Sequence, residues 1–301
     1  MSLSDTLPRS QSQTWQWRGF PIRYQSAGET GAAVLCVHGF GASSDHWRKN
    51  LPELALHHRV YAIDLIGFGR SAKPTPHQEI EYCFETWAQQ ILDFCQDVIG
   101  TPVFLVGNSI GCIAALQAAV MSPEQVQGVV MIDCSLRLLH VRKRQAIPWV
   151  RRTFAPLFQQ ILGNRALGHF FFQRLAQPKV IRRILTQAYA RKAAVTDDLV
   201  NLLIEPARDP GAADVFLAFI QYDQGPLAED LLPLLNCPVL CLWGTADPWE
   251  PIELGRAFTQ YDAVQEFIPL EGVGHCPQDE APELVNPILT RWIAQQTALS
   301  R

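Results

Sequence analysis

The chain has 301 residues, of which 48% are hydrophobic and 18% charged, a balance typical of a globular protein with a large core. Its net charge of -4 gives no reason to expect a nucleic-acid partner. The sequence contains no long apolar run, and its polar start does not resemble a secretory signal, so we expect an intracellular protein without a membrane span. The eight cysteines lack the spacing of a metal site and favour a reducing compartment.

Strand and helix patterns alternate along the first part of the chain. Residues 15–28 predict a β-hairpin, and strands are expected at 33–39, 59–65, 102–109 and 127–133, with helices at 85–100 and 110–122. From about residue 136 to 231 helical segments broken by prolines take over. Strands resume at 237–244 and 263–270, before a last helix at 282–296. This order predicts an α/β fold in which a mostly parallel central sheet has helices on both faces.

The interruption divides the chain into three parts. Residues 1–135 and 231–301 are expected to form one core, and residues 136–230 a helical cap inserted into it.

A GxSxG motif follows the expected strand at 102–109 directly and precedes a helix. It consists of Gly107, Ser109 and Gly111. Such a strand-to-helix turn requires small neighbours and lifts the serine hydroxyl above the sheet, at the positive end of the helix. We therefore predict that Ser109 is a nucleophile.

A serine nucleophile needs a base and an acid that orients the base, and these are expected in the order Ser, Asp or Glu, His. His275 follows the last expected strand, and Asp247 follows the strand before it. Asp133 also ends a strand and is a second candidate for the acid. We predict a triad of Ser109, Asp247 and His275.

Acyl transfer also needs two N–H donors for the oxyanion of its transition state. The expected donors are the backbone N–H groups of Ile110, after the nucleophile, and of Phe40, in the loop after an earlier strand. His38 in that loop is expected to shape it rather than to act as a base. No cofactor and no metal ion are expected, because dinucleotide, Walker A and HExxH motifs are absent from the sequence.

These motifs resemble the α/β-hydrolase fold over most of the chain. The resemblance rests on "HGFGASSDHW", "DLIGFGRS", "GNSIG", "GTADPWEP" and "GVGHCPQDEAPE". A narrower resemblance is to the chlorophyll dephytylases of plants and their cyanobacterial relatives, carried by "TWQWRGFPIRYQSAG", "SSDHWRKN", "SLRLLH", "GAADVFLAFI" and "ADPWEPIELGRA". Two features depart from that family: Cys112 stands where a second glycine is expected, and no plastid transit peptide is present. The resemblance implies a cyanobacterial hydrolase that removes phytol from chlorophyll.

The expected cap is rich in aromatic and basic residues. The aromatic side chains proposed to line a pocket for phytol and the pigment ring are Trp149, Phe154, Phe158, Phe170, Phe171 and Phe172. Between Arg137 and Lys192 there are 13 lysines and arginines and no acidic residue, which favours peripheral contact with an anionic membrane such as the thylakoid. The alternatives are that the rings are cap core and the basic residues a solvated face, or that the cap is a dimer interface.

Two other functions stay open at this point. The first is hydrolysis of another hydrophobic ester by the same triad, as in a lipase-like or carotenoid-ester enzyme. The second is a hydrolase fold that binds a pigment or a protein without catalysis. Epoxide hydrolases and dehalogenases of the fold need a carboxylate at the elbow, so Ser109 argues against them.

Overall fold

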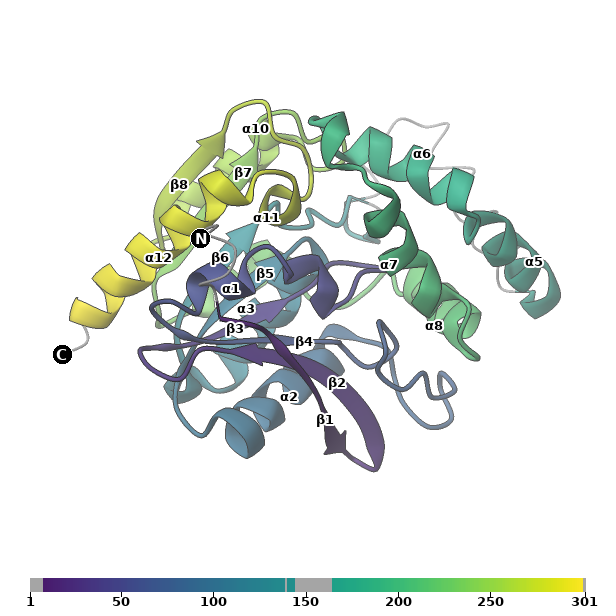
Figure 1. Cartoon of the computed structure of the whole chain (residues 1–301), viewed down its shortest axis with the longest axis horizontal. Helices are drawn as coiled ribbons and strands as arrows, with labels where there is room; N and C mark the ends of the chain where they lie inside the picture. Colours follow the sequence, from purple (N-terminus) through teal and green to yellow (C-terminus); the bar gives the residue numbers. More distant parts are fainter. Residues whose placement is uncertain (1–7, 139, 144–163, 300–301) are drawn as a thin grey trace.

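The computed structural model describes residues 8–138, 140–143 and 164–299. Its centre is an eight-stranded sheet with the order β1-β2-β4-β3-β5-β6-β7-β8 (Figure 1). The strands are β1 (Gln11–Trp17), β2 (Phe20–Ala27), β3 (Ala33–Val37), β4 (Arg59–Ile63), β5 (Val103–Asn108), β6 (Val126–Ile132), β7 (Val239–Gly244) and β8 (Val264–Leu270). The expected strands are therefore all present.

The sheet is antiparallel at one edge and parallel elsewhere. Strand β2 pairs antiparallel with β1 and with β4, whereas the pairs from β4 through β3, β5, β6 and β7 to β8 are parallel. A two-residue turn, Arg18 and Gly19, closes the hairpin of β1 and β2, and both residues have positive φ, as turns matched to strand twist require. The predicted mostly parallel sheet is confirmed.

Apolar side chains fill both faces of the sheet because helices cover both. In β5, Leu105 belongs to the core cluster that includes α2 and α3, whereas Phe104 and Val106 belong to the cluster that includes α1 and α12. The described α-helices are α1 (Leu51–Leu54), α2 (Phe84–Phe94), α3 (Ile110–Met121), α5 (Arg165–Leu175), α6 (Pro178–Ala188), α7 (Asp197–Ala207), α8 (Ala212–Gln221), α9 (Ala228–Leu231), α10 (Ile252–Gly255), α11 (Pro277–Glu280) and α12 (Pro282–Leu299).

Helices α5, α6, α7 and α8 form a separate layer on the right of Figure 1. Apolar residues of α6 and α7, among them Leu185 and Leu199, cluster with Tyr189 and with Cys276 of the core. Helix α9, which spans the boundary expected at residue 230, packs against α3. The cap boundaries at residues 136 and 230 stay a prediction.

Basic residues of the 137–192 segment find acidic partners elsewhere in the chain. Among the described residues, five lysines and arginines of this segment form ion pairs: Arg142–Asp230, Lys143–Glu229, Arg165–Asp214, Arg182–Asp197 and Arg191–Glu283. The acidic partners lie outside the segment, so a count of charges within it overestimates how much of its positive charge is unpaired. Within the described ranges, no helix combines the length and apolar character that crossing a membrane requires.

Candidate active site

Ser109 lies in a tight turn between β5 and α3. Its φ of 55° and ψ of -120° fall in a region that costs a non-glycine residue about 1–3 kcal/mol. The turn has no room for larger neighbours, because a Cβ on Gly107 would lie 2.6 Å from the backbone nitrogen of Cys112. A Cβ on Gly111 would lie 2.5 Å from the carbonyl oxygen of Val37. These glycines let the chain turn so sharply that Ser109 reaches a cavity at the end of the sheet.

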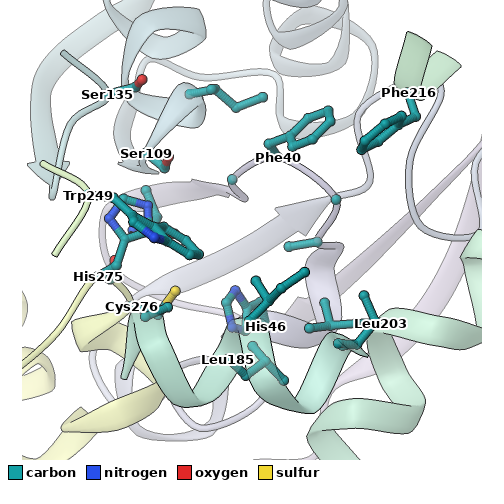
Figure 2. A pocket seen from close by; sticks show the side chains of 18 of the residues that line it. Phe40, His46, Ser109, Ser135, Leu185, Leu203, Phe216, Trp249, His275 and Cys276 are labelled. Carbon is teal, nitrogen blue, oxygen red and sulfur yellow. The ribbon is translucent and has the colours of Figure 1, made fainter. Parts of the chain in front are cut away.

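His275 and Asp247 meet beside this turn. The imidazole Nδ1 lies 2.7 Å from Asp247 Oδ2, and both side chains are buried. The other carboxylate oxygen of Asp247 accepts the backbone N–H groups of Trp249 at 2.8 Å and Glu250 at 3.1 Å. An N–H at Nδ1 that donates to the carboxylate leaves Nε2 of His275 as the basic nitrogen. Figure 2 shows the imidazole close to Ser109 on the same cavity wall.

Hydrogen bonds hold the His275 loop from two sides. Asn108, the residue before the nucleophile, donates its amide N–H to the carbonyl oxygen of His275 at 3.1 Å. From the other side, the backbone N–H of His275 donates to the carbonyl of Ala188, the last residue of α6, at 2.9 Å. Gly274 permits this contact, because a Cβ there would lie 2.1 Å from the same oxygen. The base is thus fixed relative to both the elbow and α6.

Asp133 does not contact the histidine ring in the way that Asp247 does. It follows β6, is fully buried, and accepts the backbone N–H of Gly244 at 2.9 Å. Burial, and then the charge of Asp247, raise the pKa of Asp133 well above its ordinary value. A carboxyl whose pKa is raised gives up its proton less readily and is a poorer partner for an imidazolium. The geometry therefore favours Asp247 as the acid.

Two backbone N–H groups lie near the serine. Ile110 is the first residue of α3, so its N–H has no carbonyl partner one turn earlier in the helix. Phe40 follows β3 in a loop that comes close to the elbow, where a Cβ on Gly39 would lie 3.2 Å from the Cβ of Ser109. Both Phe40 and Ile110 line the cavity. Two such donors can stabilise a tetrahedral oxyanion.

His38 shapes the Phe40 loop. Its Nδ1 lies 2.7 Å from the carbonyl oxygen of Gly39, and its Nε2 accepts the backbone N–H of Leu65 at 3.0 Å. Because both ring nitrogens are engaged and the ring is fully buried, His38 is not available as a base.

The cavity in front of Ser109 has a volume of about 440 Å³, which is in the range of small-molecule sites. It lies between the sheet and the layer of helices α5 to α8, and most of the side chains that line it are apolar. Outside that layer, the lining residues include Phe40, Ala42, His46, Ile110, Ser135, Trp249, Glu250, His275 and Cys276. The layer contributes Phe172, Ile181, Leu185, Leu203, Phe216 and Phe219. Figure 2 shows part of this lining, with Leu185, Leu203 and Phe216 of the layer labelled.

Only part of the predicted aromatic pocket lies at this cavity. The three consecutive rings sit on α5, whose turn of about 100° per residue points them in different directions. Phe172 lines the cavity and packs 5.1 Å from the ring of Phe216. Phe170 is not among the residues that line this cavity: its side chain is 56% exposed, with the guanidinium of Arg174 5.0 Å from the ring centroid. Phe171 is half-buried and is not among the residues that line the described cavity.

Trp149, Phe154 and Phe158, the other rings of the predicted pocket, lie outside the described residues. Sequence reasoning missed His46, Trp249, Glu250 and the two phenylalanines of α8. Trp249 and Glu250 follow Asp247 by two and three residues, and that proximity was a usable signal. No group of three or more metal-ligating side chains occurs within the described ranges.

Residues 34–288 match the family model described as the alpha/beta hydrolase family. The chain belongs to this family. The hydrolase is 26% identical to the chloroplastic pheophytinase of Arabidopsis thaliana, over 90% of its own length and 64% of the length of that relative. This match supports the resemblance to chlorophyll dephytylases drawn from the motifs.

The chain is also similar to hydrolases named for other activities. It is 24% identical to the (Lyso)-N-acylphosphatidylethanolamine lipase of Mus musculus, over 85% of its own length and 77% of that protein. The solved structure of the epoxide hydrolase CorEH superposes with a TM-score of 0.79 at 20% identity, covering 95% of this chain and 99% of the other. At that identity the superposition shows the fold alone.

Proposed function

We propose that this hydrolase is a serine carboxylic ester hydrolase that removes phytol from chlorophyll or a related phytylated pigment. The observation that carries the proposal is the 2.7 Å contact between His275 and Asp247 beside Ser109, at the wall of an apolar cavity. The similarity to a pheophytinase supports a pigment ester as the substrate.

The first half of the reaction transfers the acyl group to the enzyme. The hydroxyl oxygen of Ser109 attacks the ester carbonyl carbon while Nε2 of His275 takes the hydroxyl proton. Asp247 holds the imidazole tautomer and stabilises the imidazolium that forms. The carbonyl electron pair moves onto oxygen, and the N–H groups of Phe40 and Ile110 stabilise this oxyanion.

The second half of the reaction restores the enzyme. When the oxyanion collapses, the bond between the carbonyl carbon and the phytyl oxygen breaks, and His275 donates its proton to the leaving phytol. A water molecule then gives a proton to His275 and attacks the acyl-enzyme. Collapse of the second tetrahedral species returns the proton to Ser109 and releases chlorophyllide.

The cavity wall is suited to a long hydrocarbon chain. Leu185, Leu203 and Phe216 from three cap helices face the core across the cavity (Figure 2). Burying each CH₂ group of a chain in such a site contributes about 0.8 kcal/mol. The apolar wall therefore favours a phytyl ester over a short one.

The test compares purified protein on detergent-dispersed chlorophyll, on pheophytin and on a short p-nitrophenyl ester, with Ser109→Ala as the inactive control. Release of phytol by the wild type and not by the variant supports the proposal. Hydrolysis of the short ester alone, or of other lipid esters in preference to the pigments, would favour a lipase-like enzyme. No hydrolysis of any ester would favour a binding protein.

We also propose peripheral contact with the thylakoid membrane. On α6, Lys179 and Arg183 are exposed and have no carboxylate in ion-pair range among the described residues. Each such charge contributes about 1 kcal/mol near an anionic surface. Sedimentation with anionic vesicles should fall with added salt and on reversal of both residues to glutamate. Vesicle binding that stays the same after salt is added and after both residues are reversed would refute this contact.

A further inference from the structure

Glu280 is a buried carboxylate beside the His275 loop, and the proposed mechanism gives it no role. It is the last residue of α11, is 5% exposed and is not among the residues that line the cavity. Its Oε2 accepts the backbone N–H of Gly274 at 2.9 Å, and its Oε1 accepts the backbone N–H of Arg191 at 2.6 Å. One carboxylate therefore joins the residue before His275 to the chain just after α6.

Within the described ranges, no lysine or arginine lies in ion-pair range of the Glu280 carboxylate. The guanidinium of Arg191 pairs with Glu283 instead. Burial raises the pKa of Glu280, and the backbone N–H groups of Arg191 and Gly274 oppose the rise. A buried carboxylate without a counter-ion is costly, so a neutral side chain would be the better choice if the site only had to be filled. Two converging N–H groups, however, require two acceptor atoms, which a carboxylate has and an amide lacks.

Two successive N–H groups of the His275 loop are held by the segment 188–191. The N–H of Gly274 reaches it through Glu280, and the N–H of His275 donates directly to the carbonyl of Ala188. Ala188 ends α6, so its carbonyl has no partner further along that helix. The approach leaves no room for a side chain, because a Cβ on Gly274 would lie 2.9 Å from Glu280 Oε2. The orientation of the His275 backbone thus depends on where Glu280 holds this segment.

We propose that Glu280 is a positioning residue for His275, which keeps the imidazole in register with Ser109 by joining the His275 loop to the end of α6. This inference rests on the proposed ester hydrolysis but not on the identity of the ester. Glu280 touches no reacting atom and acts through the backbone of the loop. Because a misplacement of about 1 Å can cost roughly 10²-fold in rate, a small shift of the loop slows the chemical step and leaves the apolar cavity nearly intact.

The test measures kcat and KM of Glu280→Gln on p-nitrophenyl hexanoate, together with the rate at which a fluorophosphonate labels Ser109. Glutamine has nearly the same size as glutamate, but it replaces one acceptor with a donor and cannot accept both N–H groups. We expect kcat and the labelling rate to fall roughly tenfold, while KM changes by less than about twofold. A merely structural role would lower stability and leave the kinetics of the folded protein unchanged.

Two control variants separate position from charge and from stability. Glu283→Gln removes the 60% exposed carboxylate that pairs with the side chain of Arg191, and it should keep the wild-type kcat. Tyr82→Phe removes a buried hydrogen bond to the carbonyl of Pro74, at 2.7 Å, away from the residues that line the cavity. It should lower the melting temperature and also keep the wild-type kcat. Thermal unfolding of every variant sets an assay temperature at which all of them are folded.

Two results would overturn the inference. One is a folded Glu280→Gln with the kcat and labelling rate of the wild type. The other comes from amide hydrogen exchange of the wild type, which needs no variant to fold: the amides of Gly274 and Arg191 should both exchange slowly. Exchange of either amide as fast as in an unfolded chain would show that Glu280 does not hold it. If the wild type hydrolyses no ester and takes no label, the proposed ester hydrolysis has failed and the inference falls with it, an outcome that the wild type alone reveals.

Discussion

Replacing Glu250 with glutamine should change how the stability of the fold depends on pH. The Glu250 side chain is 9% exposed, lines the cavity and accepts the backbone N–H of Leu136 at 3.0 Å. Burial is the largest cause that raises the pKa of Glu250 from 4.5 to about 7, and the hydrogen bond from Leu136 opposes it. The folded protein therefore retains a proton that the unfolded chain releases.

The sign and size of the effect follow from proton linkage. Between about pH 4.5 and 7 the folded state binds more protons than the unfolded state, so the free energy of unfolding falls as pH rises and levels off above the folded pKa. One pKa unit corresponds to about 1.4 kcal/mol, so Glu250 should cost roughly 2 to 3 kcal/mol of stability between about pH 5 and pH 8. Glutamine cannot ionise, but its amide oxygen still accepts from Leu136.

The measurement is urea unfolding of wild type and Glu250→Gln at both pH values. From about pH 5 to pH 8, the free energy of unfolding of the variant should rise by roughly 2 to 3 kcal/mol relative to that of the wild type. The matched control is Glu253→Gln, which removes an exposed carboxylate nearby. It should leave the difference in unfolding free energy between the two pH values as it is in the wild type. Parallel curves of stability against pH for wild type and Glu250→Gln would refute the idea that the folded state holds this proton.

Three further predictions concern the elbow and the triad. In steady-state assays on a p-nitrophenyl ester, Ser109→Ala and His275→Ala should each lower kcat by roughly 10³ or more, and the double variant should be hardly worse, because nucleophile and base act as a unit. Asp247→Asn should be more damaging than Asp133→Asn in the same assay; the reverse order in two folded variants would reassign the acid. Gly111→Ala should reduce the melting temperature or the yield of folded protein, since its Cβ would meet a carbonyl oxygen at 2.5 Å, and an unchanged melting curve would contradict that steric argument.

The sheet could be predicted from sequence because its signals are local. Apolar runs such as 102–109 are short, bounded by turn residues and separated by helical periodicity, so each strand is visible without knowledge of its neighbours. The order along the chain also places Asp247 and His275 after adjacent strands β7 and β8, whose carboxyl ends must lie on one edge of a parallel sheet. Topology thus brings Asp247 and His275 to one edge, but it does the same for Asp133 at the end of the neighbouring strand β6 and does not choose between the two acids.

The cavity wall could not be predicted in the same way. His46 and Tyr189 are 143 residues apart in the sequence, and only the packing of helices α6 and α7 against the rest of the fold brings them together. The rings of α5 illustrate the same limit, because a run of three phenylalanines does not say which side of the helix faces the core. Ion pairs such as Arg191–Glu283 likewise neutralise charges that look unpaired within the 137–192 segment.

The most direct test of the central claim is labelling of the native protein with a fluorophosphonate, followed by mass spectrometry of its peptides. If His275 activates Ser109 for attack, a single adduct should form on Ser109, and its rate should fall by roughly 10³ in His275→Ala. Absence of label from the folded wild type, or an adduct on a residue other than Ser109, would contradict the claim that this chain is a serine hydrolase with its nucleophile at the elbow.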